Sequence, residues 1–223
     1  MFSDAAAAVR QRLVRGPLTS RALQQQTGLS QPTVSRALAA LGSEVLRSGA
    51  GRSTIYSLVD SSPDLPPLAV QRVDARGRLA RLGLLTPLQP AGFAVQRDDG
   101  STSFSEGLPW WLADLRPQGF LGRALALRHG AALGLPPSIN DWSDRHVLRA
   151  LAAFGDDAVG NLLLGDAARD RFLGAQTPVP IAAAERPAAY AALAARALQG
   201  ELAGSSAGGE QPKFMAFAHT AAG

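Results

Sequence analysis

The stretch Gly28–Leu41, which reads GLSQPTVSRALAAL, predicts a tight turn followed by a short helix. Gly28 suits a turn that requires a positive φ, because glycine has no Cβ to clash there. Ser30 can cap the helix by accepting a backbone N–H that has no helical partner. Pro32 falls in the first turn, where its missing N–H costs little. The stretch therefore decides the local fold.

This helix is expected to have two unlike faces. Three apolar residues follow the spacing i, i+4, i+7 and predict a buried stripe: Val34, Leu38 and Leu41. Short polar side chains and one arginine fall largely off that stripe: Gln31, Thr33, Ser35 and Arg36. Side chains of this kind near the start of a helix suit the major groove of DNA. The polar face is thus the candidate contact surface.

The flanking segments complete a module. Residues 5–16 predict a helix that stops at Gly16-Pro17, and residues 18–27 predict a second helix capped by Thr19. Residues 44–59 give two β-like runs around a Gly-Ala-Gly turn. The order resembles a winged helix-turn-helix of bacterial regulators, which implies a partner of duplex DNA. The residues implied to contact DNA are Ser30, Gln31, Thr33, Ser35, Arg36 and, in the wing, Arg52.

The positive charge of the chain is concentrated in this module. Residues 1–60 hold seven arginines against Asp4, Glu44 and Asp60, an excess of +4 that equals the formal excess of the whole chain. A basic patch is the electrostatic footprint of a nucleic-acid partner. A solvated basic face, or a helix-turn-helix used only for protein contact, is the alternative interpretation.

Composition excludes several classes of site. The chain has no cysteine, which excludes disulfides and thiolate metal sites. The three histidines are far apart in sequence, so no metal site is expected. No apolar run approaches the roughly 18 residues of a membrane span, and the N-terminus lacks signal-peptide features. We therefore expect a cytoplasmic protein without a membrane partner, with Trp110 and Trp111 in its core.

Residues 61–70 are rich in Pro and Ser and predict a linker after the module at 1–60. Beyond them, in residues 71–223, strand-like and helix-like segments mix without a βαβ rhythm, so the expected fold class is α+β. Asp99-Gly100 offers a hairpin turn. The clearest later helix is predicted over residues 185–204.

A second informative stretch is GSSAGGEQPKF, residues 204–214. Its glycines and serines leave backbone N–H groups with little steric cover, which suits a nest around a phosphate. Lys213, the only lysine of the chain, would add a point charge suited to phosphate oxygens. The stretch matches neither G-x-x-x-x-G-K-[ST] nor G-x-G-x-x-G. A plain glycine-rich loop is therefore the alternative.

Residues 206–213, SAGGEQPK, resemble the S-x-x-G-x-Q-x-K loop of the HipA family of serine/threonine-kinase toxins. Residues 108–126, LPWWLADLRPQGFLGRALA, are similar to the N-terminal region of those kinases. Residues 156–164 fit the segment that precedes the loop. With its helix-turn-helix, the chain looks like the YjjJ-like branch of that family. The resemblance is strongest in the loop and in residues 108–126.

The resemblance implies an ATP-dependent kinase with ATP and Mg²⁺ as cofactors. The loop over the ATP phosphates would comprise Ser205, Ser206, Ala207, Gly208, Gly209, Glu210, Gln211 and Lys213. Ser206 matches the serine that these kinases autophosphorylate. A phosphate there would compete for the N–H groups that ATP needs. The implied protein partners are a HipB-like antitoxin or a separate kinase-lobe chain.

In that family the catalytic lobe follows the loop and supplies an Asp base, an Asn and an Mg²⁺-binding Asp. Only residues 214–223 follow the loop here, so no catalytic residue is assigned and a catalytically incomplete fragment is expected. Two alternatives stay open. One is a winged-helix transcriptional regulator with a C-terminal dimerisation or effector domain, and the other is an interaction subunit of a split kinase.

Overall fold

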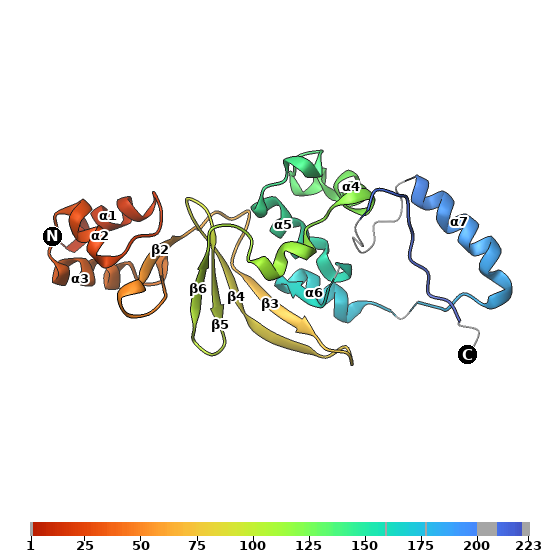
Figure 1. Cartoon of the computed structure of the whole chain (residues 1–223), viewed down its shortest axis with the longest axis horizontal. Helices are drawn as coiled ribbons and strands as arrows, with labels where there is room; N and C mark the ends of the chain where they lie inside the picture. Colours follow the sequence, from red (N-terminus) through yellow and green to blue (C-terminus); the bar gives the residue numbers. More distant parts are fainter. Residues whose placement is uncertain (1, 159, 177, 200–208, 220–223) are drawn as a thin grey trace. The chain divides into compact units, whose positions relative to one another are not determined.

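The computed structural model describes residues 2–158, 160–176, 178–199 and 209–219 (Figure 1). Contacts between residues divide the chain into two compact units. The first comprises Met1–Gln71 and Leu79–Trp110, and the second comprises Arg72–Arg78 and Trp111–Gly223. Helices and an antiparallel sheet occur together, which confirms the α+β class.

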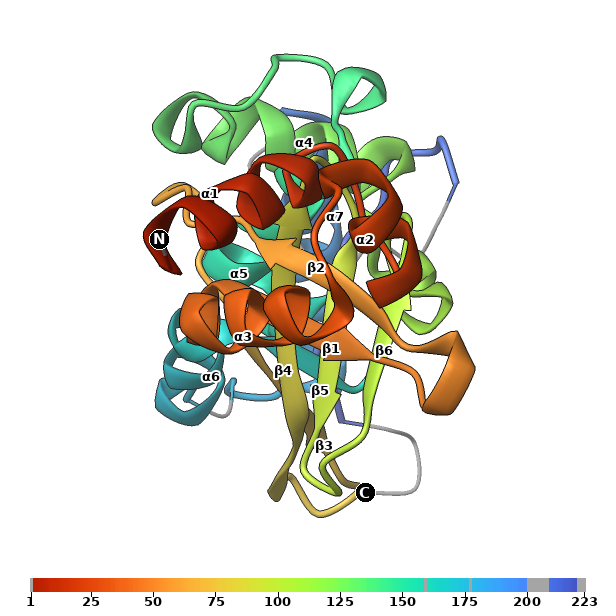
Figure 2. The same ribbon diagram turned by 90° about the vertical axis from the view of Figure 1, so that its left-hand side faces the viewer.

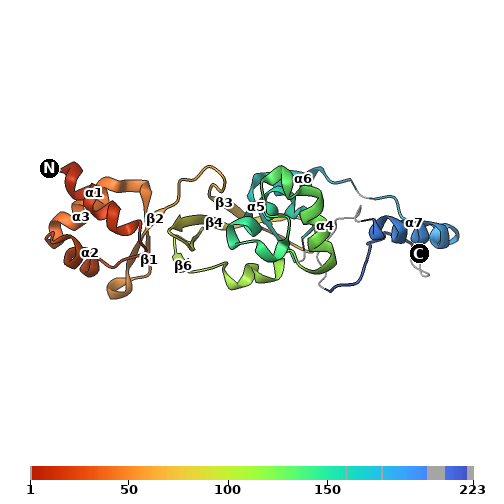
Figure 3. The same ribbon diagram turned by 90° about the horizontal axis from the view of Figure 1, so that it is seen from above.

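The first unit begins with three helices around one apolar core. These are α1 (Phe2–Leu13), α2 (Ser20–Thr27) and α3 (Gln31–Leu41). Figures 2 and 3 show the three helices gathered beside β2 (Ile55–Val59). The buried residues of this cluster come from all four elements: Val9, Leu13, Leu23, Val34, Ala37, Leu41 and Leu58. The expected stripe on α3 is confirmed at Val34 and Leu41, and Leu38 packs against the cluster while half-buried.

The helix ends follow local chemistry, with one difference from expectation. Thr19 caps α2 by accepting the N–H of Ala22 at 3.2 Å, and Gly28 ends α2 with φ +70°. Ser30 stands at the N-cap of α3, but its hydroxyl pairs with the hydroxyl of Thr33 at 2.9 Å instead of accepting a backbone N–H. Pro32 removes one of the two donors that a cap normally engages, so the capping prediction for Ser30 is wrong.

A hairpin and a meander follow the helices. After a 3₁₀ turn, η1 (Gly42–Glu44), β1 (Val45–Ser48) pairs with β2, and η2 (Gly51–Ser53) lies between them. Three more strands of the sheet are β4 (Leu79–Gln89), β5 (Phe93–Arg97) and β6 (Thr102–Ser105). β2 pairs with β4 through Leu58 and Gln89, and β4–β5–β6 continue as hairpins. The turn predicted at Asp99-Gly100 is present, with Gly100 at φ +83°.

The segment 61–70, which the sequence predicts as a linker, contains both irregular chain and strand. Leu65 is buried, and β3 (Leu68–Val73) begins at Leu68 and lies next to β4. Leu68 and Val70 are buried at alternating positions, which is the pattern of a strand. The prolines before Leu68 concealed this alternation.

The second unit is mainly helical. Its elements are η3 (Trp110–Leu115), α4 (Gly119–His129), η4 (Ala131–Leu133), η5 (Ile139–Asp141), α5 (Asp144–Phe154), η6 (Gly155–Asp157), β7 (Leu162–Leu164), α6 (Gly165–Gly174), η7 (Ala183–Glu185) and α7 (Arg186–Leu198). The end of β3 meets β7, where the Val73 N–H donates to the Asn161 carbonyl at 2.8 Å. α5 starts with a capping box in which Ser143 and His146 exchange hydrogen bonds.

Side chains from three helices of this unit contact one another around the ring of Phe154. The rings of His129 on α4 and Phe154 on α5 are stacked, with centroids 3.9 Å apart. The Arg171 guanidinium of α6 lies 4.6 Å from the Phe154 centroid, within range of a cation–π contact. Trp110, which was expected in the core, is instead 86% exposed, while Trp111 is half-buried. Over the part of the chain that is described, no helix is long and apolar enough to cross a membrane.

Candidate functional site

The outward face of α3 carries the polar residues that the sequence singled out. Its inward face is Val34, Ala37 and Leu41, all buried. Five of the six residues expected to contact DNA are on or at the start of this helix, and all but the half-exposed Thr33 are exposed: Ser30, Gln31, Thr33, Ser35 and Arg36. The backbone of Arg52 lies in η2, in the turn of the β1–β2 hairpin, and its side chain is outside the described part.

The electrostatics of this face favour an anionic partner. Neither α2 nor α3 contains an aspartate or glutamate, whereas Arg21 and Arg36 are exposed on them. The Nε of Arg36 donates to the Pro32 carbonyl at 3.2 Å, which directs the side chain back towards the helix start. Elsewhere in the module, Arg10 is paired with Glu44 at 2.9 Å, and both side chains are about half exposed. Because Glu44 is already counted in the excess of +4, this pair leaves the net charge of the module unchanged.

The glycine-rich loop is described only in part. Ser205, Ser206, Ala207 and Gly208 lie outside the described residues. The described part meets the start of α4. The Phe120 N–H donates to the Gly209 carbonyl at 3.0 Å, and Arg123 Nη1 donates to Glu210 Oε2 at 2.5 Å. Gln211 is exposed and Lys213 is half-buried.

Beside this contact is a cavity of about 490 Å³ in the second unit. Its polar wall is formed mainly by two arginines, two amide side chains and one carboxylate: Arg116, Arg123, Gln118, Asn140 and Glu210. Both arginines already have partners, because Arg116 bonds to the Asp144 carboxylate and to the Trp142 carbonyl, while Arg123 pairs with Glu210. An anion entering this cavity would compete with these internal acceptors.

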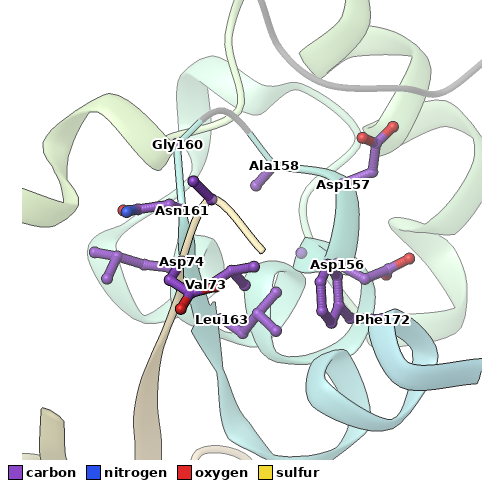
Figure 4. A pocket seen from close by; sticks show the side chains of 12 residues that line it. Val73, Asp74, Asp156, Asp157, Ala158, Gly160, Asn161, Leu163 and Phe172 are labelled. Atoms are coloured by element: carbon purple, nitrogen blue, oxygen red, sulfur yellow. The ribbon is translucent and has the colours of Figure 1, made fainter. Parts of the chain in front are cut away.

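A second cavity, of about 510 Å³, has a different character (Figure 4). Its lining includes the apolar side chains of Leu163 and Phe172 and the carboxylates of Asp74, Asp156 and Asp157. The Asp74 carboxylate accepts the N–H groups of Arg76 and Arg78 and the Arg78 side chain. The Arg78 bonds are the main cause that holds the pKa of Asp74 below its usual value. A lining that combines apolar side chains with carboxylates suits a cationic or apolar group.

Within the described residues, neither cavity has side chains arranged to hold a metal ion. Figure 4 shows the carboxyl groups of Asp156 and Asp157 apart from one another instead of converging. In the residues that the structure describes, no group of three or more His, Asp or Glu side chains is placed to hold an ion.

Sequence reasoning missed both cavities and the contact between the loop and α4. Their walls join segments about 80 to 90 positions apart in the chain, as Gly119 and Gly209 do. The glycine at position 119 is the sequence feature that could have indicated the contact between the loop and α4. It has φ +63°, and a Cβ there would lie 2.3 Å from the Gly209 carbonyl oxygen.

Comparison with known proteins found a family model and a relative to which the chain is similar. Residues 65–173 match the family model described as "YjjJ-like toxin, middle domain". Over 212 residues, or 95% of its length, the chain is 40% identical to Toxin YjjJ of Escherichia coli (strain K12). The chain spans 48% of the length of that toxin. No solved structure matches the chain. The chain is thus similar to this toxin, and residues 65–173 are similar to the middle domain of that family.

Proposed function

We propose that the chain acts as a YjjJ-like toxin that binds duplex DNA through residues 1–60, which form a winged helix-turn-helix. One observation carries the proposal. The polar face of α3 is exposed and free of acidic residues, while the opposite face is buried against α1, α2 and β2. A short helix held in this way presents its N-terminal side chains to the base edges of a major groove.

The roles within this surface follow from side-chain chemistry. Gln31 can form two hydrogen bonds with an adenine edge, and Arg36 can do so with a guanine edge. Ser30, Thr33 and Ser35 suit phosphate or base contacts. Arg52, in the turn of the hairpin, would reach a phosphate of the adjacent backbone. The formal excess of +4 in residues 1–60 supplies the attraction that does not depend on sequence.

The test compares two variants that remove the same charge. Arg36→Ala removes a cation from the α3 face, and Arg128→Ala removes an exposed cation from α4 in the other unit. Fluorescence anisotropy with duplexes selected from a random library measures affinity as a function of salt. Arg36→Ala should weaken specific binding by roughly 1–3 kcal/mol, and Arg128→Ala should not. Equal losses in both variants, or no salt-dependent binding at all, would contradict the proposal.

A second candidate function concerns the glycine-rich loop, residues 205–213. We propose that it cradles the phosphates of ATP in a HipA-like serine/threonine kinase, with Lys213 as the phosphate cation and Ser206 as the autophosphorylated residue. The observation in its favour is that the described part of the loop contacts α4, through the Gly209 carbonyl and the Glu210 carboxylate. A HipB-like antitoxin, or a separate chain that supplies a kinase lobe, would be the protein partner.

Calorimetry with MgATP tests the second candidate. The titration is made with the chain alone and with the chain mixed with the other half of the Escherichia coli relative. Lys213→Ala should abolish whatever affinity is found, and Arg128→Ala should leave it unchanged. MgATP binding that is insensitive to Lys213→Ala would refute the phosphate role of the loop. A purely regulatory protein would bind DNA and show no MgATP binding in either titration.

A further inference from the structure

The first turn of α4 holds the described part of the loop by three contacts. The first is a backbone hydrogen bond from the Phe120 N–H to the Gly209 carbonyl, 3.0 Å long. Phe120 is the second residue of α4, and N–H groups at this position have no acceptor within their own helix. The loop therefore satisfies a helix end that would otherwise depend on water.

The second contact is a close approach of two glycines. Gly119 and Gly209 both have a positive φ, +63° and +103°. A Cβ on Gly119 would meet the Gly209 carbonyl oxygen at 2.3 Å, a distance that real Cβ atoms do not tolerate. A Cβ on Gly209 would lie 3.3 Å from Lys213 Nζ. Gly209 is thus enclosed between α4 on one side and the ammonium group of Lys213 on the other.

The third contact is the ion pair between Arg123 and Glu210. Arg123 follows Gly119 by four residues, so both lie on the same face of α4. The pair is mostly exposed, with side-chain exposures of 52% and 72%, and such a pair alone contributes little stability. Its geometric effect is larger, because it fixes the residue that follows Gly209. Together the three contacts set the position of the chain at 209 and 210.

We infer that Gly119, Phe120 and Arg123 form a seat that positions Gly209 and Glu210, and through Gly209 the ammonium group of Lys213. The inference rests on the phosphate role proposed above for this loop. The three seat residues are positioning residues, and none of them is assigned a contact with the nucleotide. Removing the seat should allow residues 209–213 to leave α4 and should displace Lys213 from the place where it would meet a phosphate.

The amide hydrogen of Phe120 is a direct reporter of the seated loop. Its protection from solvent exchange comes from Gly209, whereas the neighbouring Gly122 N–H donates to the carbonyl of Gln118, the N-cap residue of α4. Exchange at both amides is measured by NMR on the whole chain. Arg123→Glu should speed exchange at Phe120 by roughly two- to fivefold, as expected for loss of an exposed ion pair. Gly122 should not change, which shows that α4 is intact.

Three further variants make the result specific. The exchanged pair Arg123→Glu with Glu210→Arg should return Phe120 to within about twofold of the original rate, because the ion pair is restored with its signs reversed. Arg128→Glu, an equal charge reversal on the same helix, should leave Phe120 unchanged. Gly119→Ala should speed exchange at Phe120 most of all. If Phe120 exchanges at the original rate in both Arg123→Glu and Gly119→Ala, the seat does not exist.

MgATP affinity, measured on the same variants, separates the seat from the function on which it rests. Arg123→Glu should weaken MgATP binding at least threefold, and the exchanged pair should restore it. Faster exchange at Phe120 with unchanged MgATP affinity would overturn the positioning role. If neither the chain nor its mixture with the other half of the relative binds MgATP, the phosphate role fails, while the Phe120 result still decides whether the seat holds the loop.

Discussion

Replacing Ser57 by alanine should stabilise the first unit. Ser57 lies on β2 opposite Leu46 of β1, on the strand face that points away from the core residue Leu58. Its side chain is fully buried, and its hydroxyl has no hydrogen-bond partner among the described residues. The hydroxyl groups of Ser48 and Thr54, in the same hairpin, are also buried without a hydrogen-bond partner among the described residues. The hairpin therefore buries hydroxyl groups without compensation.

The size of the effect follows from the cost of desolvation. Burying a hydroxyl without a partner costs about 1–3 kcal/mol, and the alanine variant removes that cost while leaving a void smaller than one methyl group. We expect a net gain of about 1 kcal/mol in the free energy of unfolding. For a chain of this size the gain corresponds to a rise of about 2–4 °C in Tm.

Thermal unfolding followed by circular dichroism measures the change. Ser53→Ala is the matched control, because the Ser53 hydroxyl is exposed and donates to the Ala50 carbonyl at 2.7 Å. That variant loses a hydrogen bond and should lower Tm slightly. A fall in Tm for Ser57→Ala equal to or larger than that of Ser53→Ala would show that Ser57 has a partner, such as a bound water, and would refute the reasoning.

Three further predictions concern separate parts of the chain. Leu23→Ala should lower the free energy of unfolding by about 2–5 kcal/mol, because Leu23 is fully buried in the helical core. Leu127→Ala, which truncates a side chain that is 79% exposed, should change it little, and urea titration of both variants measures the difference. Burial, together with the charges of Arg128 and Arg171, lowers the pKa of His129 below its usual value of 6.5. As the pH drops below about 6.5, His129 therefore binds a proton in the unfolded chain before it does so in the folded chain, and the free energy of unfolding should fall. His129→Gln should remove part of that fall in the urea midpoint between pH 7.5 and 5.5. Arg36→Ala should weaken DNA binding where Arg128→Ala does not.

Elements determined by local chemistry were predictable from the sequence. α2 follows from the Thr19 cap and the positive φ of Gly28, and α3 follows from the spacing of Val34, Leu38 and Leu41. The failed cap at Ser30 is also local, because a proline at the second helical position removes a donor. Where caps, turns and apolar spacing agree, the sequence specifies the element directly.

Elements that depend on distant partners were not predictable in the same way. β3 begins inside a Pro-rich segment, and its identity as a strand depends on pairing with β4 and β7. α6 carries polar residues on most of its surface and buries only Gly165 and Ala168, so it gave no clear helical stripe. The α3 face was identified from the sequence as the candidate DNA surface. The seat on α4 was not, because Arg123 meets Glu210 only in the folded chain.

The most direct test of the proposed DNA surface is an NMR titration of the chain with a duplex selected from a random library. We expect chemical shifts to change first and most strongly at the backbone amides of Gln31, Ser35 and Arg36, with smaller changes at Arg52 in the hairpin turn. Amides of α4, α5 and α6 should stay unchanged. Changes concentrated on α4 to α6, or no change at α3 under low-salt conditions where the duplex binds, would contradict the proposed DNA surface.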